Sequence, residues 1–134
     1  MLGKAIFMNI MKGINSLFWI FLGGGVGSIF RYTLSFFFKT NSNGFPTATF
    51  FVNVLGCFLI GLLYSLIHIE NSSLKLVLIV GFLGGFTTFS SFGNETLFLF
   101  NKGQVQTALL YVILSNICGL AAVYIGTRIS ILFS

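Results

Sequence analysis

The polar residues of this chain are few, and those that could do chemistry fall inside long apolar stretches. They are Arg31, Asn53, the run at residues 87–95, and the pair Ser115 and Asn116, with Tyr111 one turn earlier. Each such side chain costs free energy in lipid unless it is paired or faces a cavity. Their grouping therefore predicts a polar site within the membrane.

A small, strongly hydrated anion could use such a site, because several close donors must replace its water. Amide and hydroxyl donors come from Asn53, Tyr111 and the serines and threonines of the run. Phe89 and Phe92 lie three residues apart, on one helical face among the hydroxyls. Because an aromatic ring has a positive edge, a ring presented edge-on favours an anion.

The third apolar stretch predicts a broken helix. Gly81, Gly84 and Gly85 precede its hydroxyl-rich run. Glycine inside a helix costs about 1 kcal/mol relative to alanine, and non-helical backbone at membrane depth survives only beside protein or a water-filled cavity. We predict a break near residues 84–87, where freed carbonyls could hold a cation and freed N–H groups could meet an anion.

Four stretches are long enough to cross a bilayer and must position these residues. Of the 134 residues, 56% are hydrophobic and 7% are charged, far from the composition of a soluble domain. The continuous apolar runs favour helices over barrel strands. Short loops predict antiparallel neighbours with both termini on one side, and Gly103 suits a helix C-cap. The sequence predicts an all-α membrane protein, one domain over residues 1–134, with spans at about 14–38, 47–69, 74–100 and 105–132.

The basic residues do not form a nucleic-acid patch. The net charge is +5, but the cations are scattered between the spans. An N-terminus in the cytoplasm gives a four-to-two excess of cations on that side, a weak orientation signal. The first stretch lacks a small-residue cleavage site, which disfavours a signal peptide. Cys57 and Cys118 are expected to be buried free thiols, and His68 to lie at an interface.

Three motifs carry a resemblance to a known family. They are Gly23-Gly-Gly-Val-Gly-Ser-Ile-Phe-Arg31-Tyr32, Thr49-Phe-Phe-Val-Asn53-Val-Leu-Gly56-Cys-Phe-Leu-Ile-Gly61, and Gly84-Gly-Phe-Thr-Thr-Phe-Ser-Ser-Phe-Gly-Asn-Glu95. In this order, in a chain of this size, they resemble the Fluc/CrcB fluoride channels. The N-terminal extension through Met11 is longer than is usual in that family, and Met8 or Met11 is a possible start.

The resemblance implies a dual-topology dimer with two oppositely oriented subunits and two pores along their interface. It implies that a structural sodium ion binds the backbone carbonyls of Gly84 and Thr87, and that Arg31 draws anions into an aqueous vestibule. The implied fluoride pore residues are Asn53, Phe89, Phe92, Ser90, Ser91, Tyr111 and Ser115.

Most of these assignments have a simpler alternative. Arg31 could cap a neighbouring helix or reach the membrane interface. Tyr111 could belong to an interfacial belt, and Ser115 could bond back to its own helix. Glu95 is expected to orient the broken segment rather than to conduct. The remaining glycines are expected to let helices pack closely, namely Gly23, Gly27, Gly56, Gly61, Gly119 and Gly126.

The function that the resemblance implies is passive, selective export of cytoplasmic fluoride across the cell membrane, by a homodimer or by a heterodimer with a paralogous subunit. No motif argues for an enzyme. One alternative is a small four-helix coupled exporter of cationic compounds. It needs an acidic residue deep in the first helix, which here carries Arg31 and no acid. Another is a structural subunit whose polar residues only pack.

Overall fold

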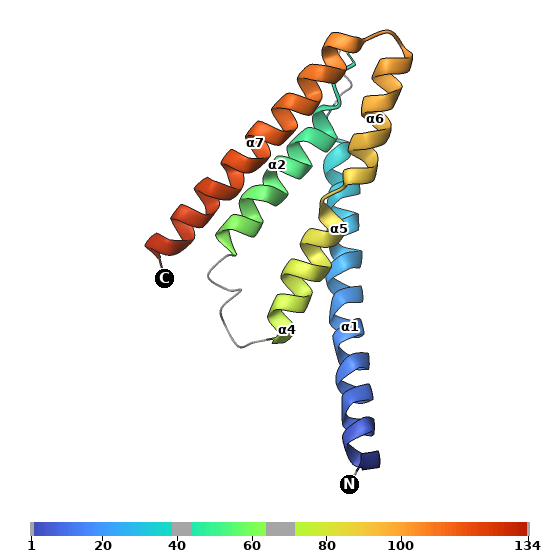
Figure 1. Ribbon diagram of the computed structural model, residues 1–134, viewed down its shortest axis with the longest axis vertical. Coiled ribbons are helices and arrows are strands. Elements are labelled where there is room, and N and C mark those ends of the chain that lie inside the picture. The colour runs from blue at the N-terminus through green and yellow to red at the C-terminus, as the bar shows by residue number, and fades with distance from the viewer. Residues whose placement is uncertain (1, 39–43, 64–71, 134) are drawn as a thin grey trace.

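The computed structural model describes residues 2–38, 44–63 and 72–133, and this part of the chain is helical (Figure 1). The first two helices are α1 (Leu2–Ser35) and α2 (Thr47–Leu62). The third span consists of four consecutive segments: α4 (Ser72–Lys75), the wider π-helical turns of η1 (Leu76–Leu83), α5 (Gly84–Phe86) and α6 (Phe89–Asn101). The last helix is α7 (Val105–Leu132). His68 and the predicted end of the second span at residue 69 lie outside the described residues.

Two of the observed helix ends have a clear local cause. α1 ends at Ser35, three residues before the predicted end, because the amides of Phe36, Phe37 and Phe38 bond back to carbonyls three residues earlier at 3.1–3.4 Å. α6 ends where Gly103 takes a φ of +74°, and the amide of Gln104 bonds to the carbonyl of Leu99 at 2.9 Å. The predicted glycine C-cap is confirmed.

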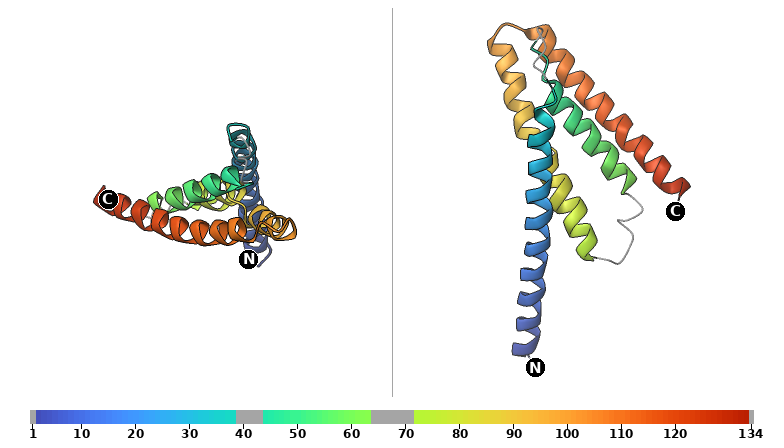
Figure 2. Two further views of the ribbon diagram at one scale, coloured as in Figure 1. Left: turned by 90° about the horizontal axis from the view of Figure 1, so that it is seen from above. Right: turned by 180° about the vertical axis from the view of Figure 1, so that it is seen from behind.

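The helices form two pairs. α1 packs along η1 and α5, and α2 packs along α7. Figure 2 shows the second pair slanting away from α1, with α6 placed beyond the break and packed against α7. Successive spans run in opposite directions, and both termini lie on the same side of the molecule (Figure 1), as predicted from the short loops.

Glycines bring each pair into backbone contact. A methyl group added to Gly27 or Gly81 would meet backbone atoms across the contact between α1 and η1 within about 3 Å, and one added to Gly61 or Gly126 would do so between α2 and α7. Substitution at any of these positions would force the helices apart. The expectation that glycines serve close helix packing is confirmed at Gly27, Gly61 and Gly126. Gly81, which was expected to weaken the third helix, has the same packing role.

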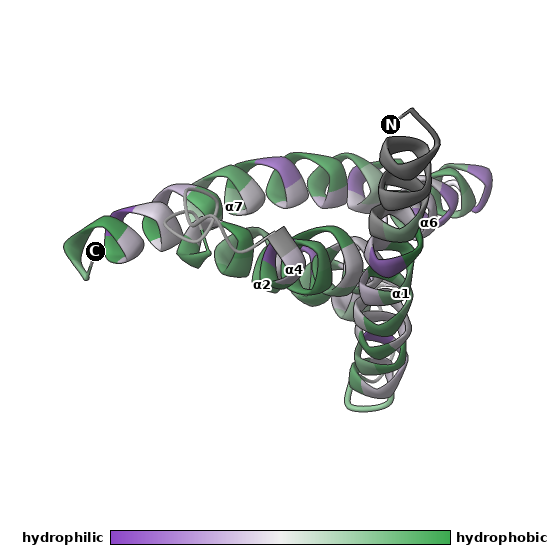
Figure 3. Ribbon diagram, turned by 90° about the horizontal axis from the view of Figure 1, so that it is seen from below, coloured by the Kyte–Doolittle hydropathy of each residue, from purple (hydrophilic) through white to green (hydrophobic). Residues whose placement is uncertain are grey.

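The outer surfaces of the helices are apolar. Three helical segments, Gly13–Ser35, Ser73–Asn101 and Val105–Leu132, are long and apolar enough to cross a membrane, and α2 is a shorter apolar helix. Hydrophobic residues dominate α1, α2 and α7 in Figure 3, and Phe21 and Leu120 are about three-quarters exposed. Because water would not tolerate such a surface, the chain is a multi-pass membrane protein.

Candidate functional site

The third span breaks at Thr87 and Thr88, where the predicted range ends. Thr87 has φ −78° and ψ 157°, and Thr88 has φ −149° and ψ 113°, so both residues are extended. Gly84 and Gly85 are still helical. The Thr88 hydroxyl accepts a 3.2 Å hydrogen bond from the amide of Ser91 and thereby caps α6.

Asn53 of α2 holds this break. Its Oδ1 accepts from the backbone N–H of Thr88 at 2.8 Å, and its Nδ2 donates to the carbonyl of the same residue at 3.0 Å. The amide thus pairs with extended backbone as a neighbouring strand would. A side-chain amide has two N–H donors, so one donor of Asn53 is not used by Thr88.

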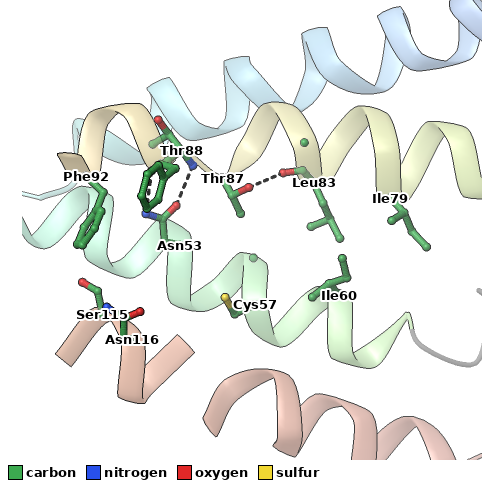
Figure 4. A pocket seen from close by; sticks show the side chains of 13 residues that line it. Asn53, Cys57, Ile60, Ile79, Leu83, Thr87, Thr88, Phe92, Ser115 and Asn116 are labelled. Atoms are coloured by element: carbon green, nitrogen blue, oxygen red, sulfur yellow. Dashed lines mark hydrogen bonds between the residues drawn. The ribbon is translucent and has the colours of Figure 1, made fainter. Parts of the chain in front are cut away.

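A cavity of about 470 Å³ lies beside the break, between the two helix pairs. Figure 4 shows Asn53 reaching toward Thr88, with Ser115 and Asn116 on α7 across the cavity. The Ser115 hydroxyl oxygen is buried without a hydrogen-bond partner in the described chain, so the alternative that it bonds back to its own helix is wrong. Asn116 does bond back, donating to the Val112 carbonyl at 2.7 Å. The cavity is lined by Asn53, Gly56, Cys57, Ile60, Ile79, Leu83, Gly84, Thr87, Thr88, Phe89, Phe92, Ser115 and Asn116.

Phe89 and Phe92 lie at the α6 end of the cavity. Their ring centroids are 5.6 Å apart, and the ring centroid of Phe92 is 5.0 Å from that of Tyr111. Phe92 is half-buried, whereas Phe89 is 84% exposed in the single chain. The predicted pair therefore shares one cavity wall, with one ring packed against the core and the other uncovered.

A carboxylate joins three helices next to these rings. Glu95 of α6 accepts hydrogen bonds from the hydroxyls of Thr49 on α2 at 2.7 Å and Tyr111 on α7 at 2.8 Å. Tyr111 is completely buried, so its assignment to an interfacial belt is wrong. It lines neither of the two cavities at the break, and its hydroxyl donates to Glu95.

Sequence reasoning missed Thr49. The signal was present, because Thr49 precedes Asn53 by one helical turn and shares its face of α2. With Glu95 at its centre, this cluster orients α6 against α2 and α7, which is the role expected for Glu95.

Replacing Tyr111 with phenylalanine should lower the free energy of unfolding by about 1–3 kcal/mol, because the half-buried carboxylate of Glu95 loses a charge-assisted donor. Unfolding of the purified protein by SDS measures this. Tyr32→Phe is the matched control, since Tyr32 is 66% exposed, and a surface change of this kind usually costs less than about 0.5 kcal/mol. Equal stabilities of the two variants would contradict the role given to Glu95.

Arg31 lies on the other side of the break. Its Nε donates to the Gly85 carbonyl at 3.1 Å, so it caps the neighbouring helix, as the simpler alternative stated. It also lines a second cavity of about 270 Å³, together with Thr49, Thr88 and Ser91. Ser90 is exposed, with its hydroxyl oxygen 3.3 Å from that of Thr88.

Fold and site together define a class: a multi-pass membrane protein with hydrogen-bond donors gathered at a broken helix, as ion-conducting proteins have. The family model described as CrcB-like protein, Camphor Resistance (CrcB), matches residues 18–127. A relative from Phocaeicola vulgatus named fluoride-specific ion channel FluC is 45% identical over 121 residues, covering 87% of this chain and 99% of the relative.

Two further relatives carry the same name. The protein from Flavobacterium psychrophilum is 41% identical over 121 residues, covering 87% of this chain and 98% of its own. The protein from Shewanella sp. strain ANA-3 is 42% identical over 119 residues, covering 87% and 96%. The chain belongs to the CrcB/FluC family, as its three motifs predicted. The relatives are named as ion channels, in line with the prediction that the chain is not an enzyme.

Proposed function

We propose that this chain is a subunit of a fluoride-selective channel that lets cytoplasmic fluoride leave the cell passively. The observation that carries the proposal is a pair of donors in one cavity that have no partner among the residues described: the second N–H of Asn53 and the hydroxyl of Ser115, beside Phe89 and Phe92. These groups replace part of the water that a small anion must shed. The names of the relatives support the same ion.

Passive export is sufficient to remove fluoride from the cytoplasm. Fluoride enters a cell as the neutral acid when the outside is acidic, and it is trapped when the acid ionises inside. An interior-negative potential drives an anion outward by about 2.3 kcal/mol per 100 mV. A pore therefore needs no coupled ion, which separates it from a coupled exporter.

The broken helix also fits a structural monovalent cation. In an unbroken helix the Gly84 carbonyl would accept from the amide of Thr88, and the Thr87 carbonyl from the amide of Ser91. Here those amides bond to Asn53 Oδ1 and Thr88 Oγ1 instead. Within the described chain the two carbonyls have no hydrogen-bond donor, and both residues line the larger cavity. We propose that they hold sodium, which neutralises the carbonyl dipoles and fixes the break.

The proposed assembly is an antiparallel dimer. A methyl group added to Gly84 would meet nothing within 4 Å in the single chain, although Gly84 lies at the break beside the cavity. Phe89 is similarly uncovered. A second copy packed against this face would enclose the cavity and cover the ring. We propose that the partner is a second copy of this chain; a paralogous subunit is the alternative.

Gly84→Leu should therefore leave the monomer folded and prevent dimer formation. The added Cβ meets no described atom of its own chain within 4 Å, but the side chain would occupy space that the partner needs. Light scattering coupled to size-exclusion chromatography in detergent measures the mass. Gly25→Leu is the matched control, since Gly25 is equally open and lies on α1. A Gly84→Leu protein that remains dimeric would contradict this interface.

Fluoride efflux from liposomes tests the function. Vesicles containing the purified chain alone are loaded with potassium fluoride, and efflux is started with valinomycin in the absence of a proton gradient. We expect rapid fluoride release. A coupled exporter would instead require the proton gradient, and a structural subunit would release no fluoride. Release that begins only after a paralogous chain is added would overturn the homodimer and leave the channel function standing.

A further inference from the structure

α1 presents a polar stripe to the smaller cavity at the break. Ser28, Arg31 and Ser35 are spaced at i, i+3 and i+7 and line this cavity. Arg31 Nε donates to the Gly85 carbonyl at 3.1 Å, and the Ser28 hydroxyl donates to the same oxygen at 3.4 Å. Ser35 differs, because its hydroxyl donates to the Tyr32 carbonyl of its own helix at 2.6 Å. Two of the three side chains thus converge on one carbonyl.

The close approach of the backbones makes this contact possible. A methyl group added to Gly85 would collide with the carbonyl oxygen of Gly24 and reach 3.0 Å from the Ser28 hydroxyl. The Gly85 carbonyl therefore lies directly against α1. Arg31 is half-buried there and has no carboxylate partner within the described residues, so its charge faces the carbonyl end of the helix that stops at Phe86.

A cation suits this position for a general reason. The last carbonyls of a helix lack intrahelical donors and carry the negative end of the helix dipole. At this helix end the Gly85 carbonyl has two side-chain donors, whereas the carbonyls of Gly84 and Thr87 have none within the described chain. In the sequence, the carbonyl that Arg31 caps (Gly85) stands between the two that are proposed to bind sodium (Gly84 and Thr87).

We infer that Arg31, assisted by Ser28, is a positioning residue that caps the Gly85 carbonyl and so fixes the backbone in which Gly84 and Thr87 can bind a monovalent cation. This inference rests on the proposed sodium site. It differs from a role in attracting anions, because Arg31 then acts through backbone geometry rather than on the passing ion. The two roles predict opposite signs for one measurement. Charge alone opposes a nearby cation, so neutralising Arg31 would tighten sodium binding, whereas loss of positioning weakens it.

Sodium-dependent thermal stability of the full-length purified protein tests the inference. The unfolding temperature is followed while sodium chloride replaces choline chloride at constant ionic strength, which gives the sodium concentration for half-maximal stabilisation. We expect this midpoint to rise about tenfold in Arg31→Gln and about threefold in Ser28→Ala, as for loss of a charge-assisted and a neutral hydrogen bond. Ser35→Ala is the matched control and should leave the midpoint unchanged.

The midpoint separates positioning from a merely structural role, which would lower the unfolding temperature in choline without moving the midpoint. An unchanged or lower midpoint in Arg31→Gln would overturn the inference, as would equal midpoints for Ser28→Ala and Ser35→Ala. If Arg31→Gln does not fold, the comparison of the midpoints of Ser28→Ala and Ser35→Ala tests the inference instead. If sodium does not raise the unfolding temperature of the wild-type protein, both the sodium site and this inference are refuted. If sodium stabilises the wild type and Arg31→Gln with the same midpoint, only the inference is refuted.

Discussion

Replacing Asn53 with leucine is expected to reduce fluoride efflux about 100-fold. The side chain both pairs with the extended backbone of Thr88 and offers its second N–H to the cavity. Its loss removes an anion donor and leaves the N–H and C=O of the half-buried Thr88 without their partner, at up to about 1–3 kcal/mol each. A few kcal/mol at the narrow part of a pore corresponds to two or more powers of ten in rate. Initial efflux rates from liposomes of matched protein content measure this.

Asn116→Leu is the control for this change. Asn116 is an asparagine that lines the same cavity, but its amide bonds to the Val112 carbonyl of its own helix and does not touch the break. Its replacement should change efflux by less than about threefold, because the pairing between Asn53 and the backbone of Thr88 is kept. If both leucine variants conduct like the wild type while assembling normally, Asn53 has no place in the pathway.

Phe89→Leu is expected to lower fluoride efflux about tenfold with the dimer intact. Leucine keeps an apolar side chain at the α6 end of the cavity but has no positive ring edge, and aromatic edge interactions contribute about 0.5–1.5 kcal/mol. Phe92→Leu should show a similar loss with an added cost in stability, since Phe92 also packs against Tyr111. Efflux and oligomer mass are measured on the same preparations.

Phe100→Leu provides the matched comparison on the same helix. Phe100 is 40% exposed on α6 and lines neither cavity at the break. Its replacement should leave efflux unchanged, because the side chain lies at neither cavity. Equal efflux in Phe89→Leu, Phe92→Leu and Phe100→Leu would remove the rings from the mechanism.

The sequence predicted most of what local patterns determine. Continuous apolar runs predicted the helices, and Gly103 predicted the end of α6. The break was placed correctly, but its cause was not. Glycines were expected to weaken the helix, whereas Gly85 remains helical and lets α1 approach. The chain leaves the helix at Thr87 and Thr88 because the side chain of Asn53 pairs with the extended backbone.

Long-range pairing limited what could be predicted of the site. Nothing in the spacing of Arg31 shows that its guanidinium meets Gly85, since that depends on contact between α1 and the broken helix. Glu95 meets Thr49 and Tyr111 for the same kind of reason, through three helices that converge. The roles of these residues in conduction, and the dimer, stay predictions.

The reversal potential of a planar bilayer containing the purified chain tests the central claim most directly. With fluoride and chloride gradients in opposite directions, the current should reverse at the equilibrium potential of fluoride, because the donors at the broken helix substitute for the hydration of the smaller ion. A current that reverses at the chloride potential, or between the two, would contradict the account.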